Sequence, residues 1–386
     1  MSSIPVPEEI LVNILLRLPF KAISLCRCVC KLWYTLLSNP SFVKTHYDLS
    51  IEKNYPNTIL RADVNGKHAI YSIIYDPLSS SLSASRCEIH YPFETKGKVE
   101  ILGSSNGLLC IHVGEYFDES TICIWNPTTK EYKRVPKSPN NQFPCDLIMH
   151  DFMNAYGFCY DCRIDDYKFI KVVGFIGVPS RSGVQVYKLG SDSWSTHRFI
   201  PYYFPCNTRR LGITVHESLH WLARPGVESY LQESPDVIVS FNICEERFDA
   251  LAFPASVENE NVIKEQELGA LDGCLCLLLQ DPNCRVDLWV MREYGVRESW
   301  SILFSTTHDL VVDHHIRSNF LVYSFENDEV LLGNFDSFIL YNPRYDRAKT
   351  VTIPGIRGSG EVESYLTSLF SLNSRTYVGE DDRIED

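Results

Sequence analysis

The sequence lacks the features of membrane-spanning and secreted proteins. No apolar run approaches the roughly 20 residues that a membrane-spanning helix needs. No charged leader with an apolar segment opens the chain, and none of its 386 residues forms an Asn-x-Ser/Thr acceptor with a permitted middle residue. We therefore expect a reducing compartment, cytoplasmic and/or nuclear, in which the 14 cysteines are mostly small core residues.

Positive charge is also scarce. The chain has 36 Lys and Arg against 49 Asp and Glu, a formal net charge of −13. Residues 1–46 hold two acids and five bases, a net of +3, which leaves −16 for residues 47–386. Such an acidic body disfavours binding to a nucleic-acid backbone. It is compatible with a basic protein partner, and equally with solubility alone.

The first 46 residues predict a small module of three helices. Pro7 sits at a position where a first-turn proline is tolerated, Glu8 and Glu9 favour the N-terminal end of the helix dipole, and Pro19 ends the first helix. Apolar residues at helical spacing then predict a second helix from near Lys21 and a third over 25–36. A module of about 40 residues cannot bury all of its apolar side chains, which indicates a partner.

This module resembles an F-box. The resemblance rests on the proline and two acids, on apolar positions through LLRLP, and on CVCKLW with the closing Pro40-x-Phe42. It departs at Val6, where the family usually has leucine. The resemblance implies docking onto the Skp-type adaptor of a cullin-RING ubiquitin ligase; the alternative is a helical cap on the chain's own downstream domain. The implied adaptor-binding residues are Pro7, Ile10, Ile14, Leu15, Leu18, Pro19, Leu25, Val29 and Trp33.

After a connector at 47–58, the pattern changes to short strands separated by Gly, Pro, Asn and Asp turns. A unit recurs in which an apolar strand ends at an aromatic residue and a polar turn leads into another strand, as in TICIWNPTTKEYKRVP. Steps of 62, 54, 48 and 52 residues between these aromatics are typical of kelch-type four-stranded propeller blades. The markers are Trp125, Tyr187, Phe241, Trp289 and Tyr341.

Five blades are visible in this pattern, and the strands within 58–75, closed by the C-terminus, can supply another. The sequence therefore predicts an all-β propeller-like domain of about six blades over 59–378, followed by an acidic tail at 379–386. A two-sheet β-sandwich is the alternative, because it also contains many short strands.

This body resembles the F-box-associated domain of the large plant F-box family. It shares GSSNGLLCI, IWNP, YGFCYD, VYKLGSDSW, SLHWLA and DLWVMREYG with that family. The resemblance extends to S-locus F-box proteins, which recognise basic ribonucleases, and to related defence-regulating F-box families. It implies target binding through loops, of which the long ones are 77–98, 137–150, 201–210, 225–236 and 255–267. Candidate target-binding residues are Arg181, Arg209, Arg210, Glu258 and Glu260.

One motif suggests a zinc hydrolase. His216-Glu217-x-x-His220 matches H-E-x-x-H, in which two histidines one helical turn apart bind zinc and the glutamate acts as general base. The flanking ITV and WLARP predict strands instead, with Glu217-Ser218 as the turn between them. We therefore keep zinc hydrolysis only as a distant alternative.

Two further motifs have structural interpretations. Gly103–Gly107 matches the G-x-S-x-G hydrolase elbow, but Asn106-Gly107 before a strand predicts a hairpin. Cys159-x-x-Cys162 has no second pair, which favours a structural role over a metal or redox site. Cys26, Cys28 and Cys30 are expected to be packing residues of the third helix.

The sequence thus predicts the substrate-recognition subunit of a Skp–cullin–F-box ubiquitin ligase. The F-box contacts the adaptor and, through it, cullin, while the β-domain holds a target protein for ubiquitination and degradation. The subunit contributes proximity and no catalytic residue, cofactor or metal of its own. The alternatives are an S-locus-type F-box that recognises non-self ribonucleases, and a scaffold outside the ligase.

Overall fold

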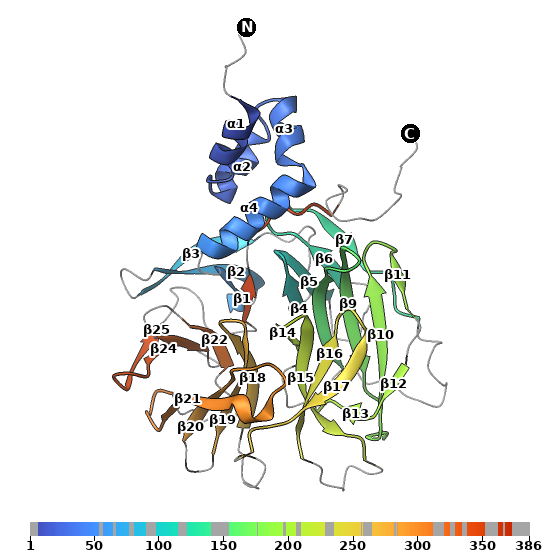
Figure 1. The fold of residues 1–386 in the computed structure, drawn as a ribbon, viewed down its shortest axis with the longest axis vertical. Coiled ribbons are helices and arrows are strands. Elements are labelled where there is room, and N and C mark those ends of the chain that lie inside the picture. Colours follow the sequence, from blue (N-terminus) through green and yellow to red (C-terminus); the bar gives the residue numbers. More distant parts are fainter. Residues whose placement is uncertain are drawn as a thin grey trace.

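The structure is a computed structural model in which a group of helices lies on one side of a larger β-domain (Figure 1). The helices come from the N-terminus, and the C-terminal part of the chain returns toward them. The structure describes residues 7–53, 57–64, 67–76, 81–89, 98–114, 122–139, 154–175, 177–195, 198–205, 210–227, 235–255, 257, 265–281, 283, 285–311, 320–324, 329–333, 338–351, 362–365 and 367–372.

Four helices are described where three were predicted. They are α1 (Glu8–Leu15), α2 (Phe20–Cys26), α3 (Lys31–Leu37) and α4 (Pro40–Lys53). Pro7 and Pro19 precede α1 and α2, as their fixed φ and missing amide favour. The predicted helix over 25–36 is wrong, because the backbone of Cys30 is extended, with φ −160° and ψ 165°.

The three closely spaced cysteines are therefore divided between elements. Cys26 ends α2, Cys28 lies in the turn, and Cys30 precedes α3. The helix α4 continues past the predicted boundary at residue 46 and reaches Lys53. Much of the predicted connector at 47–58 is therefore helical.

The helices share one small core. Leu15, Ile23, Leu37, Phe42 and Val43 are buried together at its centre. His46 of α4 adds a polar tie, since its Nε2 lies 3.0 Å from the carbonyl oxygen of Leu18. Within α3, Trp33 lies three and four positions before Leu36 and Leu37, and all three belong to this core, which is the spacing of an amphipathic helix.

The β-domain consists of six sheets among the described residues. One is composite: β26 (Val362–Tyr365) pairs with β1 (Asn57–Val64), which continues to β2 (Lys67–Asp76) and β3 (Ser81–Ile89). The second contains β4 (Lys98–Ser105), β5 (Leu108–Gly114), β6 (Ile122–Trp125) and β7 (Tyr132–Arg134). The third contains β8 (Ala155–Asp161), β9 (Asp166–Val173), β10 (Ser182–Lys188) and β11 (Ser193–Trp194), with β12 (Arg198–Ile200) on β10.

The remaining three sheets follow in chain order. The fourth contains β13 (Tyr202–Tyr203), β15 (Ser218–Pro225), β16 (Val237–Asn242) and β17 (Arg247–Leu251), with β14 (Ile213–Val215) on β15. The fifth contains β18 (Glu265–Leu271), β19 (Cys274–Gln280), β20 (Val286–Met291) and β21 (Trp300–Thr306), with the short 3-10 helix Arg297–Ser299 before β21. The sixth contains β22 (Phe320–Ser324), β23 (Val330–Gly333), β24 (Phe338–Asn342) and β25 (Arg347–Val351).

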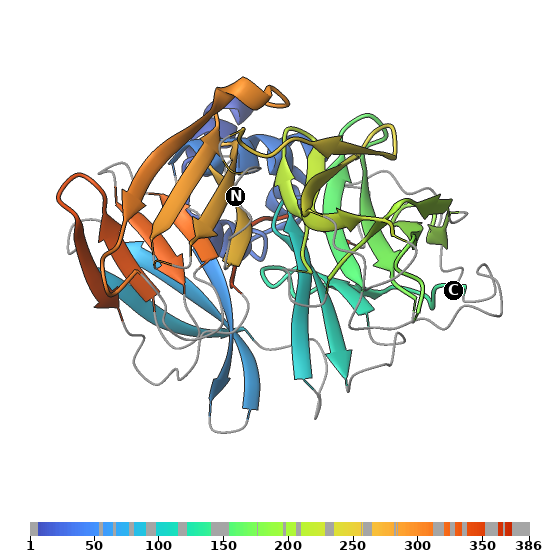
Figure 2. The same ribbon diagram turned by 90° about the horizontal axis from the view of Figure 1, so that it is seen from below.

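The sheets are arranged around a common centre as a β-propeller (Figure 2). First strands lie beside first strands: β26 contacts β4, β4 contacts β8, β18 contacts β22 and β22 contacts β26. A parallel bridge between Tyr156 of β8 and Leu211, just before β14, joins the third sheet to the fourth. The β14 strand in turn contacts β18. This ring of separate sheets excludes the sandwich alternative.

The repeat found in the sequence corresponds to the sheets. All five aromatic markers lie in the third strand of their sheet, in β6, β10, β16, β20 and β24. Five sheets are contiguous in the chain, and the composite sheet joins the first strands to the C-terminus through the pairing of β1 with β26. The predicted closure by the C-terminus is therefore confirmed.

The strands of each sheet end on two opposite sides of the propeller. Because the strands are antiparallel, the first and third turns of a sheet lie on the same side, which we call the turn edge. At this edge lie 106–107, 126–131, 162–165, 189–192, 216–217, 243–246, 272–273 and 343–346. We call the opposite ends of the strands the loop edge.

The predicted 77–98 loop was wrong, because β3 occupies Ser81–Ile89.

Candidate docking surfaces

The N-terminal helical module, which resembles an F-box, leaves a group of apolar side chains in solvent. Ile10 and Ile14 of α1 are each 51% exposed, Leu25 of α2 is 73% exposed, Val29 of the following turn is 65% exposed, and Leu32 of α3 is 67% exposed. We call these five residues the F-box apolar surface. Burying large apolar side chains is worth about 1.5–3 kcal/mol each, so this exposure is costly unless a partner covers it.

The predicted adaptor-binding residues divide into three groups. Four of them, Ile10, Ile14, Leu25 and Val29, belong to the F-box apolar surface. Pro7 and Pro19 are exposed where α1 and α2 begin. The other three are not fully accessible: Leu18 and Trp33 pack against the helical core, and Leu15 lies inside it with 1% exposure.

Leu15 is therefore corrected to a core residue, because its position in α1 points it at Ile23, Leu37 and Val43. Sequence reasoning missed Leu32 as a surface residue. Helical spacing could not have placed it, because the extended backbone at Cys30 puts Leu25 and Leu32 on two different helices.

A C-terminal segment connects the F-box to the β-domain. We call residues 365–372 the C-terminal strap. Its Leu369 is buried in the helical core of the F-box, and its Leu372 is buried between the second and third sheets. The ring of Phe370 lies 5.4 Å from that of Tyr47 in α4, in an edge-on arrangement. One short segment thus contacts both parts of the molecule.

Polar contacts fix the strap to the β6–β7 turn. The side-chain amide of buried Asn126 donates to the carbonyl oxygens of Phe370 at 2.6 Å and Ser368 at 3.3 Å. The carboxylate of Glu131 accepts from Ser371 Oγ at 2.8 Å and from the Leu372 amide at 2.7 Å. Hydrogen bonds to a charged acceptor are the stronger kind, so Glu131 is a main anchor.

The contact with 126–131 places the F-box on the turn-edge side of the propeller, as Figure 1 shows. The strap also continues the composite sheet, because Tyr365 of β26 hydrogen-bonds Thr128 Oγ1 through its hydroxyl at 3.0 Å. This link was not predicted, because the β-domain was expected to continue to residue 378.

The described target-binding candidates lie at the loop edge. Arg181 immediately precedes β10, and its guanidinium lies 4.3 Å from the centre of the Phe199 ring. Arg210 donates from Nε to the carbonyl oxygen of Asn154 at 3.0 Å and lies over Tyr156, so it is part of the packing there. Arg209, Glu258 and Glu260 lie outside the described residues.

The H-E-x-x-H motif forms a hairpin and not a helix. His216 and Glu217 are the two turn residues, with φ of 47° and 55°, and Val215 pairs with Ser218. The turn is thus one residue earlier than predicted. Buried His220 uses both ring nitrogens, since Nδ1 lies 3.1 Å from the Ile213 carbonyl oxygen and Nε2 lies 2.7 Å from the Tyr294 hydroxyl.

This environment makes His220 a neutral structural histidine. Burial lowers its pKa to about 4. The G-x-S-x-G segment is also structural, because Asn106-Gly107 forms a turn with positive φ at both residues and β5 follows it. Neither motif has the geometry that its enzyme class requires.

A buried ion network joins the third and fourth sheets at the turn edge. Lys168 of β9 lies 2.7 Å from the carboxylate of Asp161 and 2.9 Å from that of Glu246, and it donates to the Ile243 carbonyl oxygen at 2.8 Å. Burial lowers the pKa of the Lys168 ammonium, but the hydrogen bonds to both carboxylates outweigh this and raise it overall. Sequence reasoning did not find this network.

Among the residues that the structure describes, no helix is long and apolar enough to cross a membrane. In the same part of the chain the cysteines are free thiols. Of the Cys159-x-x-Cys162 pair, Cys159 is buried in the sheet and Cys162 is exposed in the next turn. The two thiols therefore do not form one site.

Comparison with known proteins agrees with this architecture. The model of the F-box associated beta propeller domain matches residues 64–354, and that of the F-box domain matches 6–45. F-box protein CPR1 of Arabidopsis thaliana is 30% identical over 383 residues, covering 94% of this chain and 88% of the relative. The F-box/kelch-repeat protein At3g23880 of the same plant is 27% identical over 386 residues, covering 95% and 96%.

Solved structures resemble the chain only distantly. A SapL1 lectin structure in complex with alpha methyl fucoside covers 78% of this chain and 97% of its own, with 9% identity and a TM-score of 0.40. That likeness is too low to inform function. The family matches span both parts of the molecule, and the chain belongs to the plant F-box proteins that carry an F-box-associated β-propeller domain.

Proposed function

We propose that this protein is the substrate-recognition subunit of a Skp–cullin–F-box ubiquitin ligase. The observation that carries the proposal is the F-box apolar surface, whose five side chains are between 51% and 73% exposed although the helices have a filled core. A partner that covers this surface removes the cost of its exposure. Within the family, that partner is a Skp-type adaptor, which itself binds cullin.

The two ends of the molecule suit two different partners. We assign adaptor docking to residues 1–46 and target binding to the propeller, 59–378, with the target on the loop edge opposite the F-box. The C-terminal strap and α4 hold these two parts together. Such a subunit raises the effective concentration of target lysines near the carrier protein that holds activated ubiquitin. It needs no catalytic residue of its own.

The acidic character of the propeller side favours a basic target, because residues 47–386 carry a net charge of −16. A non-self ribonuclease of the S-locus type belongs to that class. The ligase role places the protein in the cytoplasm or nucleus.

The test is co-expression of the full chain with a plant Skp-type adaptor, followed by size-exclusion chromatography. We expect a 1:1 complex with the wild type. The double substitution Leu25→Asp/Val29→Asp places charges on exposed positions and should weaken the complex at least about 100-fold without unfolding the chain. Ile164→Asp, at a 46% exposed apolar residue of the propeller, is the matched control and should bind normally.

Leu18→Ala/Pro19→Ala is a second test, in which loss of binding is also expected. Because Leu18 packs on the core, its interpretation requires that the variant is still folded. Retained wild-type binding by both double variants would contradict the docking assignment.

The scaffold alternative is distinguished by a further step. Adding cullin to the purified adaptor complex should give a larger assembly if the protein serves a ligase. An adaptor complex that excludes cullin would favour a scaffold outside the ligase.

A further inference from the structure

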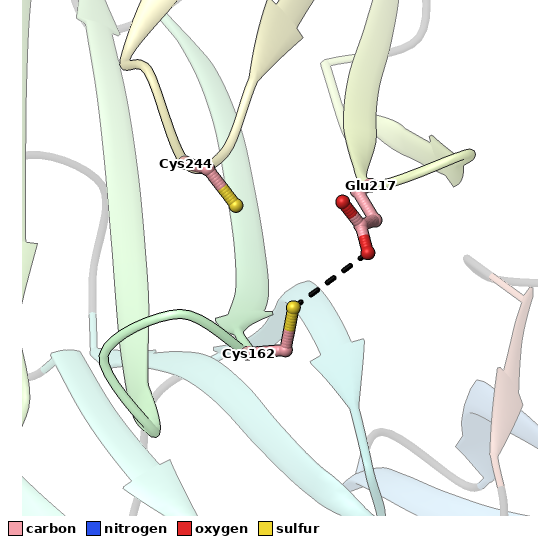
Figure 3. Close-up of side chains that lie close together, drawn as sticks. All are labelled: Cys162, Glu217 and Cys244. Carbon is pink, nitrogen blue, oxygen red and sulfur yellow. Dashed lines mark hydrogen bonds between the residues drawn. The ribbon is translucent and has the colours of Figure 1, made fainter.

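Three turns of two neighbouring sheets bring a group of metal-ligating side chains together at the turn edge (Figure 3). Cys162 lies in the β8–β9 turn of the third sheet, and Glu217 and Cys244 lie in the β14–β15 and β16–β17 turns of the fourth. Their ligand atoms all lie within 4.8 Å of one another. Cys162 and Glu217 are exposed and Cys244 is half-buried, so an ion can reach them from solvent.

The spacing suits a small tetrahedral ion. The Cys162 Sγ lies 3.6 Å from Glu217 Oε1. Zinc bonds of about 2.3 Å to sulfur and about 2.0–2.2 Å to oxygen, at tetrahedral angles, place the two ligand atoms roughly 3.5 Å apart. Two thiolates and one carboxylate also match the preference of thiolate-rich sites for zinc over harder cations such as magnesium or calcium.

We propose that Cys162, Glu217 and Cys244 form a zinc site that links the third and fourth sheets. Three protein ligands leave the fourth tetrahedral position open, which water can fill. The site is independent of the F-box apolar surface. The site takes one residue from each metal motif of the sequence, Cys162 and Glu217, and excludes their partners. Cys159 is buried with its Sγ 3.8 Å from the Lys168 carbonyl oxygen, and both ring nitrogens of His220 are engaged.

The backbones that carry these ligands are well fixed, which lowers the cost of ordering them. Asn242 Oδ1 accepts from the amides of Cys244 and Glu245 at 3.1 and 2.8 Å and so shapes the β16–β17 turn. Asp161 Oδ1 accepts from the amide of Arg163 at 3.0 Å and shapes the β8–β9 turn in the same way. Glu217 is held in a two-residue hairpin turn with positive φ.

A polar network already connects the two sheets beside the proposed site. Asp161 lies 3.4 Å from the Cys244 sulfur and is itself paired with Lys168, whose network already crosses from the third sheet to the fourth. An ion bound beside this network would add a second connection between the two sheets. Such a link stabilises the folded protein in proportion to the occupancy of the site.

The experiment uses the full chain, stripped of metal and kept in a thiol-free phosphine reductant. It is titrated with Co²⁺, whose thiolate charge-transfer and tetrahedral d–d bands report on coordination, and then with Zn²⁺ in competition. We expect one equivalent of Co²⁺ to bind with a thiolate band and to be displaced by Zn²⁺. Zinc should also raise the thermal unfolding midpoint, and a chelator should reverse that increase.

Variants identify the ligands. Cys162→Ser and Cys244→Ser should each weaken Co²⁺ binding at least about tenfold and reduce the thiolate band, while Glu217→Gln should weaken binding but keep the band. Cys274→Ser is the matched control, because Cys274 follows the corresponding turn of the fifth sheet and should leave binding unchanged. The proposal is overturned if the wild type gives no thiolate band, or if the band and affinity persist in Cys162→Ser and Cys244→Ser.

Discussion

The F-box and the propeller differ in how much of their large apolar side chains is exposed to solvent. In the propeller, large aromatic residues such as Trp125, Trp221 and Tyr341 are almost completely buried between neighbouring sheets. In the F-box, Leu25 and Leu32 are about two-thirds or more exposed although a core has formed beside them. In the part of the chain that the structure describes, the propeller buries these aromatic side chains, whereas the F-box has large apolar side chains on its surface as well as in its core.

The comparison also separates two kinds of stabilisation. The propeller closes on itself through β26 and through ion and hydrogen-bond networks between sheets. The core of the F-box includes Leu369, which comes from the C-terminal part of the chain. Substitutions should therefore have different consequences in the two parts.

The largest effect is expected in the propeller, from Lys168→Ala. This change leaves the buried carboxylate of Asp161 without its cation, and loss of one partner of a buried pair costs about 3–5 kcal/mol. Chemical denaturation measures the change in free energy of unfolding. Lys188→Ala is the control: Lys188 pairs with the same Glu246 at 3.3 Å but is partly exposed, and its loss should cost less than about 1 kcal/mol.

The next effect separates two adjacent residues of α1. Leu15→Ala removes a core side chain and should destabilise the F-box by about 3 kcal/mol. Ile14→Ala removes an exposed one and should change stability by less than about 0.5 kcal/mol while weakening adaptor binding. Unfolding and adaptor affinity measured on both variants check this. Equal destabilisation by both would contradict the outward orientation of Ile14.

His220 gives the stability of the propeller a pH dependence, because burial lowers its pKa. Its folded pKa of about 4 lies below the unfolded value of about 6.5. Between these two pH values the unfolded chain binds a proton that the folded chain excludes. The free energy of unfolding therefore decreases as the pH is lowered, by up to about 3 kcal/mol in total. Unfolding curves from pH 7 to 4 should show this slope in the wild type and His216→Gln but not in His220→Gln. A slope retained in His220→Gln would contradict the assignment.

The smallest effect tests the C-terminal strap. Asn126→Ala removes the two hydrogen bonds to the strap and should destabilise the protein by about 2 kcal/mol, with faster amide exchange over 367–372. Asn342 shapes the equivalent turn of the sixth sheet through its Oδ1 and makes no described contact with the strap. Asn342→Ala should therefore leave exchange in the strap unchanged, and an equal effect of both variants would mean that the strap is held elsewhere.

Much of the architecture could be predicted because local pattern and tertiary packing agree. Each of the five aromatic markers lies in the third strand of its sheet, and a polar turn after that strand reverses the chain. The structural repeat is therefore visible as a repeat of the sequence pattern. Helix boundaries were predicted less accurately where an apolar pattern fits either one helix or two. The apolar stripe through 25–36 fits one helix, but the extended backbone at Cys30 divides it into two.

Contacts between distant turns could not be predicted. Residues 162, 217 and 244 come from three turns, and the strap contacts residues more than 200 positions earlier in the chain. Single-sequence patterns report on periodicity within an element and contain little information on which elements meet. The orientation of Leu15 was missed for a related reason, because an apolar stripe alone does not separate its buried edge from its exposed edge.

The most direct test of the central claim is amide hydrogen exchange of the full chain with and without a Skp-type adaptor. The claim is that the adaptor covers the F-box apolar surface and leaves the propeller free. We expect the adaptor to slow exchange in peptides spanning 8–37, with no change in peptides at the loop edge around 177–181 and 210–212. Protection at the loop edge, with 8–37 unchanged, would contradict the account.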